Sequence, residues 1–120
     1  MGRDLIHRMR GLFPAPGLGE SAWEPAADVY QTPDGWLVKF DLAGVKPGDV
    51  KLSAEGRRLT VQGTRRDWCL DEGCCHYRLE ITYSEFERSV VLPNSLDRAT
   101  ISAEHRDGML LVRIQQEGEH

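Results

Sequence analysis

Apolar and polar side chains alternate with a period of two along most of the chain after residue 35, which is the spacing of β-strands. The alternation occupies several short runs: residues 36–42, 50–55, 59–62, 77–83, 86–92, 100–103 and 110–114. Turn-forming sequences separate nearly every pair of runs: Pro33-Asp34-Gly35, Pro47-Gly48, Glu55-Gly56, Pro93-Asn94-Ser95 and Asp107-Gly108. Seven or eight short strands, each with one apolar face and no long helical run among them, predict an all-β chain folded as two packed antiparallel sheets.

The first 24 residues follow a different pattern. Prolines and glycines over residues 14–19 predict a linker, and the apolar residues before it recur at spacings near 3.6, as on a short amphipathic helix: Leu5, Ile6, Met9, Leu12 and Phe13. This segment is either a frayed tail or an arm that buries its apolar face against a partner, because isolated helices this short are marginal in water. We therefore expect an arm (1–24), a sandwich domain (25–116) and a short tail (117–120).

Composition excludes several classes of function. The chain has 120 residues and a net charge of −4, whereas binding to nucleic-acid phosphates requires a basic face. No apolar run is long enough to span a membrane, and the charged N-terminus does not have the pattern of a secretory signal. Three cysteines crowded between residues 69 and 75 fit a reducing cytoplasm better than a disulfide framework. We thus expect a cytoplasmic protein with neither nucleic acid nor membrane as its partner.

The cysteine cluster is the strongest candidate for metal or thiol chemistry in the sequence. Thiolates and imidazole are ligands that zinc prefers, and the cluster offers four such groups: Cys69, Cys74, Cys75 and His76. Adjacent residues on an extended chain point to opposite sides, however, and the spacing matches no zinc knuckle. The cluster is open to three interpretations: a metal site, a redox-responsive thiol or intermolecular disulfide, or incidental loop cysteines.

A set of short motifs runs in fixed order through residues 23–115. They are Trp23-Glu24-Pro25-Ala26-Ala27-Asp28-Val29-Tyr30-Gln31-Thr32, Phe40-Asp41-Leu42-Ala43-Gly44-Val45, Lys46-Pro47-Gly48-Asp49-Val50, Leu59-Thr60-Val61-Gln62-Gly63, Phe86-Glu87-Arg88-Ser89-Val90-Val91-Leu92-Pro93 and Ala103-Glu104-His105-Arg106-Asp107-Gly108-Met109-Leu110. Each motif is weak alone, but together they resemble the small heat-shock proteins, which carry an alpha-crystallin domain. The resemblance implies an immunoglobulin-like β-sandwich.

The resemblance also implies a function without catalysis or cofactor. Proteins of this family are ATP-independent holdases, which bind non-native client proteins and prevent their aggregation by competing with client–client association. The chain contains no Gly-rich phosphate-binding loop of the kind that a nucleotide site requires. We therefore expect a chaperone that is not an enzyme.

Assembly follows from the resemblance too. In the bacterial and plant type of the family, a loop such as residues 65–77 carries a strand that is exchanged between protomers and pairs with the partner's first strand, here 28–31. The implied dimer interface comprises Asp28, Val29, Tyr30, Trp68, Cys69, Leu70 and Arg88. This loop is more apolar here than is usual in the family, which indicates either a more apolar dimer interface or a client contact.

A second surface is implied between the family's fourth and eighth strands, where a neighbour's Ile-x-Ile tail docks to build large oligomers. The corresponding groove residues, for a partner or a client, are Val50, Leu52, Ile101 and Ala103. The chain ends at residue 120 without a free Ile-x-Ile, since Val112-Arg113-Ile114 lies within the predicted last strand. We expect a homodimer or small oligomer, unless the N-terminal arm fills the groove.

Individual residues leave further alternatives. Arg88 is either a strand residue that reaches solvent or, as the resemblance implies, a structural arginine near the protomer interface. Trp36 is predicted to pack in the core, while Trp23 and Trp68 are candidate interface anchors. The competing functions are a CS-type sandwich adaptor that docks on a larger chaperone, and a redox- or zinc-responsive binding protein that uses the cysteine cluster.

Overall fold

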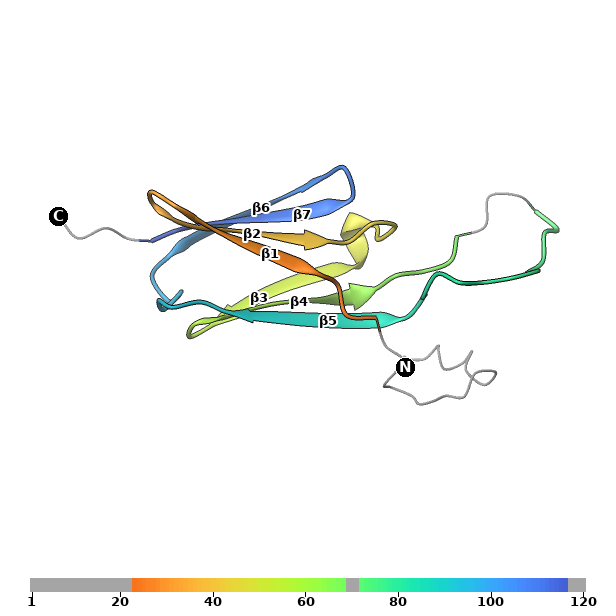
Figure 1. The fold of residues 1–120 in the computed structure, drawn as a ribbon, viewed down its shortest axis with the longest axis horizontal. Helices are drawn as coiled ribbons and strands as arrows, with labels where there is room; N and C mark the ends of the chain where they lie inside the picture. Colours follow the sequence, from red (N-terminus) through yellow and green to blue (C-terminus); the bar gives the residue numbers. More distant parts are fainter. Residues whose placement is uncertain (1–22, 69–71, 117–120) are drawn as a thin grey trace.

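The computed structural model describes residues 23–68 and 72–116, which form two antiparallel sheets packed face to face (Figure 1). The larger sheet has the strand order β1-β2-β7-β6, formed by Ala27–Thr32 (β1), Gly35–Asp41 (β2), Met109–Gln115 (β7) and Thr100–Arg106 (β6). The smaller sheet has the order β3-β4-β5, formed by Val50–Glu55 (β3), Arg58–Thr64 (β4) and Glu85–Val91 (β5). The predicted antiparallel sandwich is confirmed, with seven strands in the described part of the chain.

Tight turns join β1 to β2, β3 to β4 and β6 to β7. Between β6 and β7, Asp107 and Gly108 both have positive φ, 53° and 79°, and the flanking Arg106 and Met109 are paired. Two consecutive residues with positive φ match the right-handed twist of the strands that they connect, and glycine adopts this conformation without steric cost. The Asp-Gly sequence therefore forms the hairpin that the alternation on either side of it predicts.

Two connections carry the chain from one sheet to the other. The first leaves β2, buries Leu42 and Val45, and passes through a 3₁₀ turn at Pro47–Asp49 (η2) before β3. The second follows β5, and its buried Leu92 and Leu96 donate backbone hydrogen bonds to the carbonyls of the β3–β4 turn. Because these connecting residues are apolar and hydrogen-bonded, they close the two ends of the sandwich.

The core lies between the sheets and is built from the inward-facing positions that the alternation identifies. Phe40, Leu59 and Ile114 are fully buried, and each contributes about 2 kcal/mol by the transfer of its side chain out of water. Trp36 packs against this core, while its Nε1 donates a hydrogen bond to Asn94 Oδ1 at 3.3 Å. The rest of the buried apolar set is Val38, Leu42, Val45, Val61, Phe86, Val90, Leu92, Leu96, Leu110 and Val112.

One predicted strand is wrong. Residues 77–83 alternate as a strand would, but they lie outside any strand and belong to a long connection, residues 65–84, between β4 and β5. An isolated extended segment is not a stable strand because its backbone groups have no neighbour to pair with. The connection therefore extends beyond the predicted loop of residues 65–77 and projects from the end of the sandwich (Figure 1).

The helical content of the described residues is confined to short turns. In residues 23–68 and 72–116, no helix has the length and apolarity needed to cross a membrane. The predicted arm residues Leu5, Ile6, Met9, Leu12 and Phe13 lie outside the described part of the chain.

Candidate functional site

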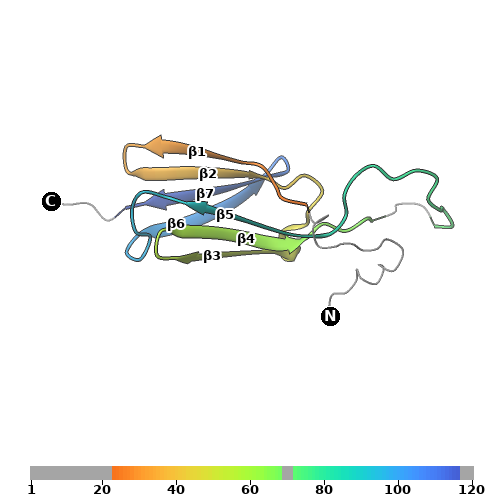
Figure 2. The same cartoon turned by 60° about the horizontal axis from the view of Figure 1, so that its bottom comes forward.

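The outer strand of the larger sheet presents an open edge. In the described residues β1 pairs only with β2, so the backbone groups along its other edge have no strand beside them (Figure 2). Val29 and Tyr30 are each 43% exposed, and Asp28 is exposed as well. Open edges pair readily with another extended segment. The predicted interface residues on β1 therefore lie where a second chain has access to them.

The two faces of β1 differ in chemistry. Val29 pairs in register with the fully buried Val38, so it lies on the inner face of the sheet, towards the core. Tyr30 lies on the outer face, where Lys39 Nζ is 5.4 Å from the centre of its ring. Asp28 shares the outer face with Tyr30 and accepts a long hydrogen bond from the Tyr30 hydroxyl at 3.5 Å. The edge of β1 is thus apolar on its inner side and polar on its outer side.

The loop between β4 and β5 carries apolar side chains into solvent. Tyr77 is 97% exposed, Leu79 53% and Ile81 59%, and they alternate with the charged Arg78 and Glu80. Arg78 Nη1 lies 3.6 Å from Glu80 Oε2, so the polar side of this segment forms its own ion pair. Three exposed apolar residues at strand spacing indicate a surface that a partner covers. The same alternation that wrongly predicts a strand within one protomer identifies this surface.

The remaining predicted interface residues of the loop are only partly described. Trp68 is 52% exposed and lies near the start of the loop. Cys69 and Leu70 lie outside the described residues. By contrast, Trp23, a second predicted interface anchor, is half-buried and packs its ring against Phe86 of its own protomer.

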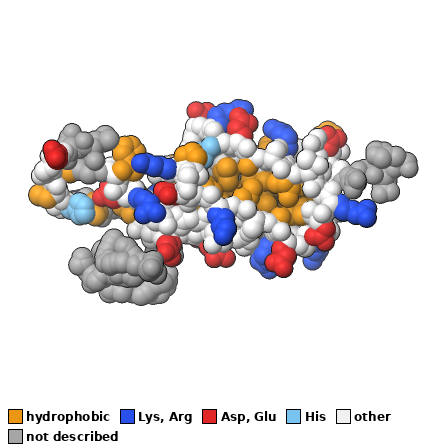
Figure 3. All heavy atoms as spheres, turned by 180° about the vertical axis from the view of Figure 1, so that it is seen from behind, with side chains coloured by type: hydrophobic (Ala, Val, Ile, Leu, Met, Phe, Trp, Pro, Cys, Tyr) orange, Lys and Arg blue, Asp and Glu red, His pale blue; other side chains and the backbone are white. Residues whose placement is uncertain are grey.

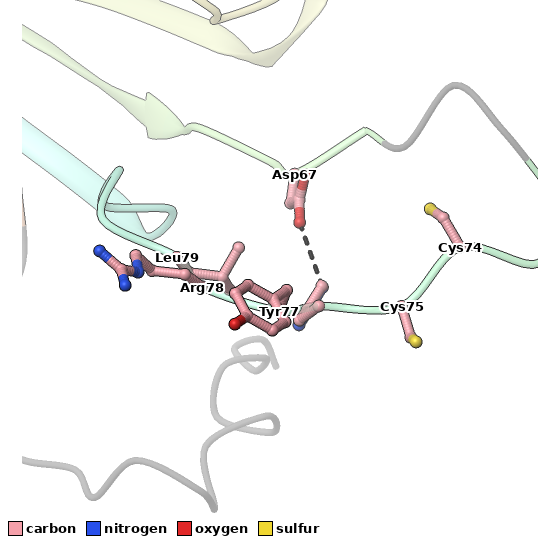
Figure 4. A pocket seen from close by; sticks show the side chains of 7 residues that line it. Asp67, Cys74, Cys75, Tyr77, Arg78 and Leu79 are labelled. Carbon is pink, nitrogen blue, oxygen red and sulfur yellow. Dashed lines mark ion pairs between the residues drawn. The ribbon is translucent and has the colours of Figure 1, made fainter.

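Two of the cysteines, Cys74 and Cys75, line an open hollow of about 520 Å³ in this loop (Figure 4). The other lining residues are Asp67, His76, Tyr77, Arg78 and Leu79. Cys74 and Cys75 point to opposite sides of the chain, as expected for adjacent residues of an extended segment. Cys74 is disulfide-bonded, so the expectation of reduced cysteines is wrong for this residue, whereas the Cys75 thiol is free and exposed. His76 Nε2 lies 3.4 Å from Asp67 Oδ2. Among the described residues, no three histidine, cysteine or acidic side chains are grouped so as to hold a metal ion.

Arg88 lies on the inner face of β5, where it pairs in register with the buried Val61. Its Nη1 donates to the carbonyl oxygen of Pro25 at 2.9 Å, and its Nε makes a longer contact of 3.4 Å with the carbonyl of Ser89. It forms no ion pair with any described carboxylate. Arg88 is therefore half-buried and holds the segment that precedes β1, instead of extending freely into solvent.

The predicted groove lies between the outer strands β3 and β6 of the two sheets. Val50, Leu52 and Ile101 are partly buried against the core, and Ala103 is exposed. Figure 3, which shows the molecule from behind, has apolar side chains gathered over the middle of the sandwich and charged side chains mostly around them. At the turn end of β6, Glu104 accepts hydrogen bonds from Arg106 and raises the pKa of that guanidinium, through the hydrogen bond and then through its charge. The four residues thus share the inner faces of the two outer strands, where we expect the apolar opening between β3 and β6.

Comparison with known proteins places the chain in a family. The sequence profile of the Hsp20/alpha crystallin family matches residues 28–120. A heat shock protein of Dictyostelium discoideum is 30% identical over 108 residues, which are 88% of this chain and 26% of that protein. A 17.9 kDa class II heat shock protein of Glycine max is 33% identical over 91 residues, 75% of this chain and 57% of the relative. The chain thus spans between about a quarter and two-thirds of the length of the curated relatives that it matches.

Solved structures agree with the sequence comparison. Heat shock protein 16.0 from Schizosaccharomyces pombe superimposes with a TM-score of 0.66 at 26% identity, over 82% of this chain and 96% of that one. HspA from Xanthomonas axonopodis gives a TM-score of 0.64 at 28% identity, over 78% and 94% of the two chains. The chain belongs to the Hsp20/alpha crystallin family of small heat shock proteins, and its β-sandwich is the alpha-crystallin domain.

Proposed function

We propose that this protein is an ATP-independent holdase chaperone of the cytoplasm that binds partly unfolded proteins and prevents their aggregation. The observation that carries the proposal is the exposed apolar surface of segment 77–81. The partly buried apolar residues at the expected opening between β3 and β6 support it as a second site. Exposed apolar surface binds non-native chains by removing water from both partners. Binding of this kind lowers the concentration of free unfolded client, so it requires neither nucleotide nor a catalytic step.

The active unit in this proposal is a homodimer formed by strand exchange. The segment 77–81 of one protomer pairs with the edge of β1 in the other, and the reciprocal pairing follows from two-fold symmetry. Pairing satisfies the backbone groups of both segments and leaves neither edge open to uncontrolled association. The cost of ordering the long loop is offset by the burial of three exposed apolar side chains in each protomer.

The chemistry of the two segments determines which side faces inward. Tyr77, Leu79 and Ile81 share one side of the extended segment, and Arg78 and Glu80 share the other. The inner side of β1 carries Val29, while its outer side carries Asp28 and Tyr30, with the charge of Lys39 on the neighbouring β2 beside them. The apolar side of the exchanged segment therefore continues the inner face of the partner's sheet, because the opposite orientation would place Leu79 among charges.

Light scattering of a heated client enzyme tests the holdase activity. Without ATP, the protein is expected to suppress client aggregation at near-stoichiometric ratios, and ATP is expected to change nothing. A sample that never slows aggregation at any ratio would contradict the proposal and favour the CS-type adaptor, which acts by docking on a larger chaperone.

Size-exclusion chromatography with multi-angle light scattering tests the dimer. The expected mass is twice the chain mass of 13.6 kDa, or a small multiple of it. A uniform particle of about 24 subunits would show that further contacts, such as those of residues 1–22, dominate the assembly. The same measurement on Cys75→Ser separates strand exchange from an intermolecular disulfide through the free Cys75 thiol, since this variant removes that thiol and leaves the disulfide of Cys74 intact.

A further inference from the structure

Arg65 lies where the long loop leaves β4, and its side chain contacts three segments that are distant in sequence. Its Nε donates to the carbonyl oxygen of Thr82 at 2.9 Å, on the returning side of the loop. Its Nη1 donates to the carbonyl oxygen of Ala43, in the turn after β2, at 3.2 Å. The guanidinium carbon also lies 3.7 Å from the centre of the Trp23 ring, at the start of the described domain. One side chain therefore links the loop, the β2 turn and the residue at which the arm joins the sandwich.

Trp23 is itself held against the loop base by a second set of contacts. Its backbone N–H donates to Ser84 Oγ at 3.1 Å, and its ring packs edge-on against Phe86 with the centroids 5.3 Å apart. The backbone N–H of Arg65 donates to the carbonyl of Ser84 at 2.9 Å. Arg65 and Trp23 thus share Ser84 as a partner and contact each other directly, so neither moves far without the other.

The guanidinium group suits this position. It is planar, stays charged at any physiological pH, stacks on an aromatic ring and directs donors to separate acceptors within its plane. A lysine ammonium is a point charge, which cannot lie over the ring and reach both carbonyls together. The neighbouring Arg66 has no such role, because its side chain is 64% exposed and makes a surface ion pair with Asp49 at 3.1 Å.

We propose that Arg65 is a positioning residue that locks the loop base and the start of the domain into one unit. This inference rests on the strand exchange proposed above. With the lock closed, the loop leaves the sandwich in one direction, and segment 77–81 is presented to a second protomer with less orientational entropy to lose. Arg65 also joins Trp23 to the same loop, so the start of the sandwich domain and the base of the exchanged segment share one side chain as a contact.

Amide hydrogen exchange measured by NMR on the full chain tests the lock. In Arg65→Gln, the backbone amides of Trp23 and Arg65 are expected to exchange about tenfold faster together, because a stacking contact and two hydrogen bonds are lost. In Arg65→Lys, the exchange rates of both amides are expected to lie between those of Arg65→Gln and those of the native protein. Trp23→Leu is expected to accelerate the Arg65 amide as well, since the coupling runs in both directions. The matched control is Arg66→Gln, which makes the same charge change one residue away and leaves both amides within about twofold of native.

Dimer dissociation by dilution tests the positioning role on the same variants. Arg65→Gln is expected to raise the dimer dissociation constant about tenfold, while Arg66→Gln leaves it unchanged. Acceleration of only one of the two amides, or an equal effect of Arg66→Gln, would overturn the lock. Linked acceleration with an unchanged dissociation constant would overturn the positioning role. If the native protein is monomeric at all concentrations and the two amides still accelerate together in the variants, the lock is supported and strand exchange is contradicted.

Discussion

At the scale of single residues, the sandwich depends on a few positions where the backbone comes unusually close to its neighbours. Gly63 in β4 lies against the carbonyl oxygen of Asp49 and the ring of Phe86, and a methyl group at this position would overlap that carbonyl oxygen. The glycine in the Leu-Thr-Val-Gln-Gly motif is therefore a packing requirement, because the last residue of η2, Asp49, lies against β4 at that point.

Gly63→Ala is expected to lower the free energy of unfolding by about 1–3 kcal/mol, the usual cost of inserting a methyl group into a closely packed site. Urea denaturation measures the loss. Gly48→Ala is the matched control, since no atom lies within 4 Å of its added methyl group, and it is expected to change stability by less than about 0.5 kcal/mol. Equal stability of the two variants would show that η2 moves away without cost.

Arg88→Ala tests the half-buried arginine. The variant leaves the Pro25 carbonyl without its charged donor, and the expected loss of stability is about 2 kcal/mol. A weaker dimer is also expected, because Pro25 lies two residues before β1. Thermal unfolding and the dimer dissociation constant measure the two effects. The exposed Arg58 on β4 serves as control, and Arg58→Ala is expected to leave both quantities unchanged. If Arg88→Ala has the native melting temperature and the native dimer dissociation constant, Arg88 has no structural role beyond that of a surface residue.

At the scale of elements, the loop of residues 65–84 has a role that neither sheet provides. It contains exposed apolar residues at strand spacing, and β1 provides an open edge of matching chemistry. The two segments belong to one chain but lie in different places: the loop extends beyond one end of the sandwich, and β1 is the outer strand of the larger sheet (Figure 1). Their complementarity is the basis for the proposed strand exchange.

Leu79→Asp is expected to raise the dimer dissociation constant by about a hundredfold, because two symmetry-related leucines are lost from the interface and a charge replaces each. Analytical ultracentrifugation over a dilution series measures it. Val91→Asp is a closely matched control: Val91 is 54% exposed against 53% for Leu79, but it lies on β5, away from the loop. A similar effect of both substitutions would indicate general destabilisation and contradict a specific role for segment 77–81.

At the scale of the whole molecule, the open edges of the two sheets divide the surface into two regions. The β1 edge and the loop serve self-association in our proposal, and the opening between β3 and β6 remains available to clients or further copies. The separation predicts that client binding and dimerisation respond to different substitutions.

Ala103→Glu is expected to weaken client protection about tenfold while the mass and melting temperature of the dimer stay the same, because a charge enters the apolar opening where clients would have to desolvate it. The concentration of chaperone that halves client light scattering measures the change. Ser102→Glu is the control, since the same side chain is placed one residue earlier, where it points to the opposite face of β6 beside Arg113. Unchanged protection by Ala103→Glu would remove this opening from the client surface.

The sequence alone determined the sandwich. Alternation of period two recurs between turn sequences, and burial of one face per strand is the only way for such runs to form a core, so β2, β4 and β7 were identifiable from residues such as Phe40, Val61 and Val112. The Asp107-Gly108 hairpin could also be predicted from local sequence, because the turn conformation that it requires depends on those two residues.

Only the tertiary structure decided where the alternating segment 77–83 belongs and what Arg65 and Arg88 contact. Alternation indicates which face of a segment is apolar, but not whether a neighbouring strand exists, and residues 77–83 have none in the part of the protomer that the structure describes. Arg65 reaches acceptors 17 and 22 residues away, and Arg88 one 63 residues away. Local pattern contains no information on contacts of this range, since they arise only when the packed sheets bring separate turns together.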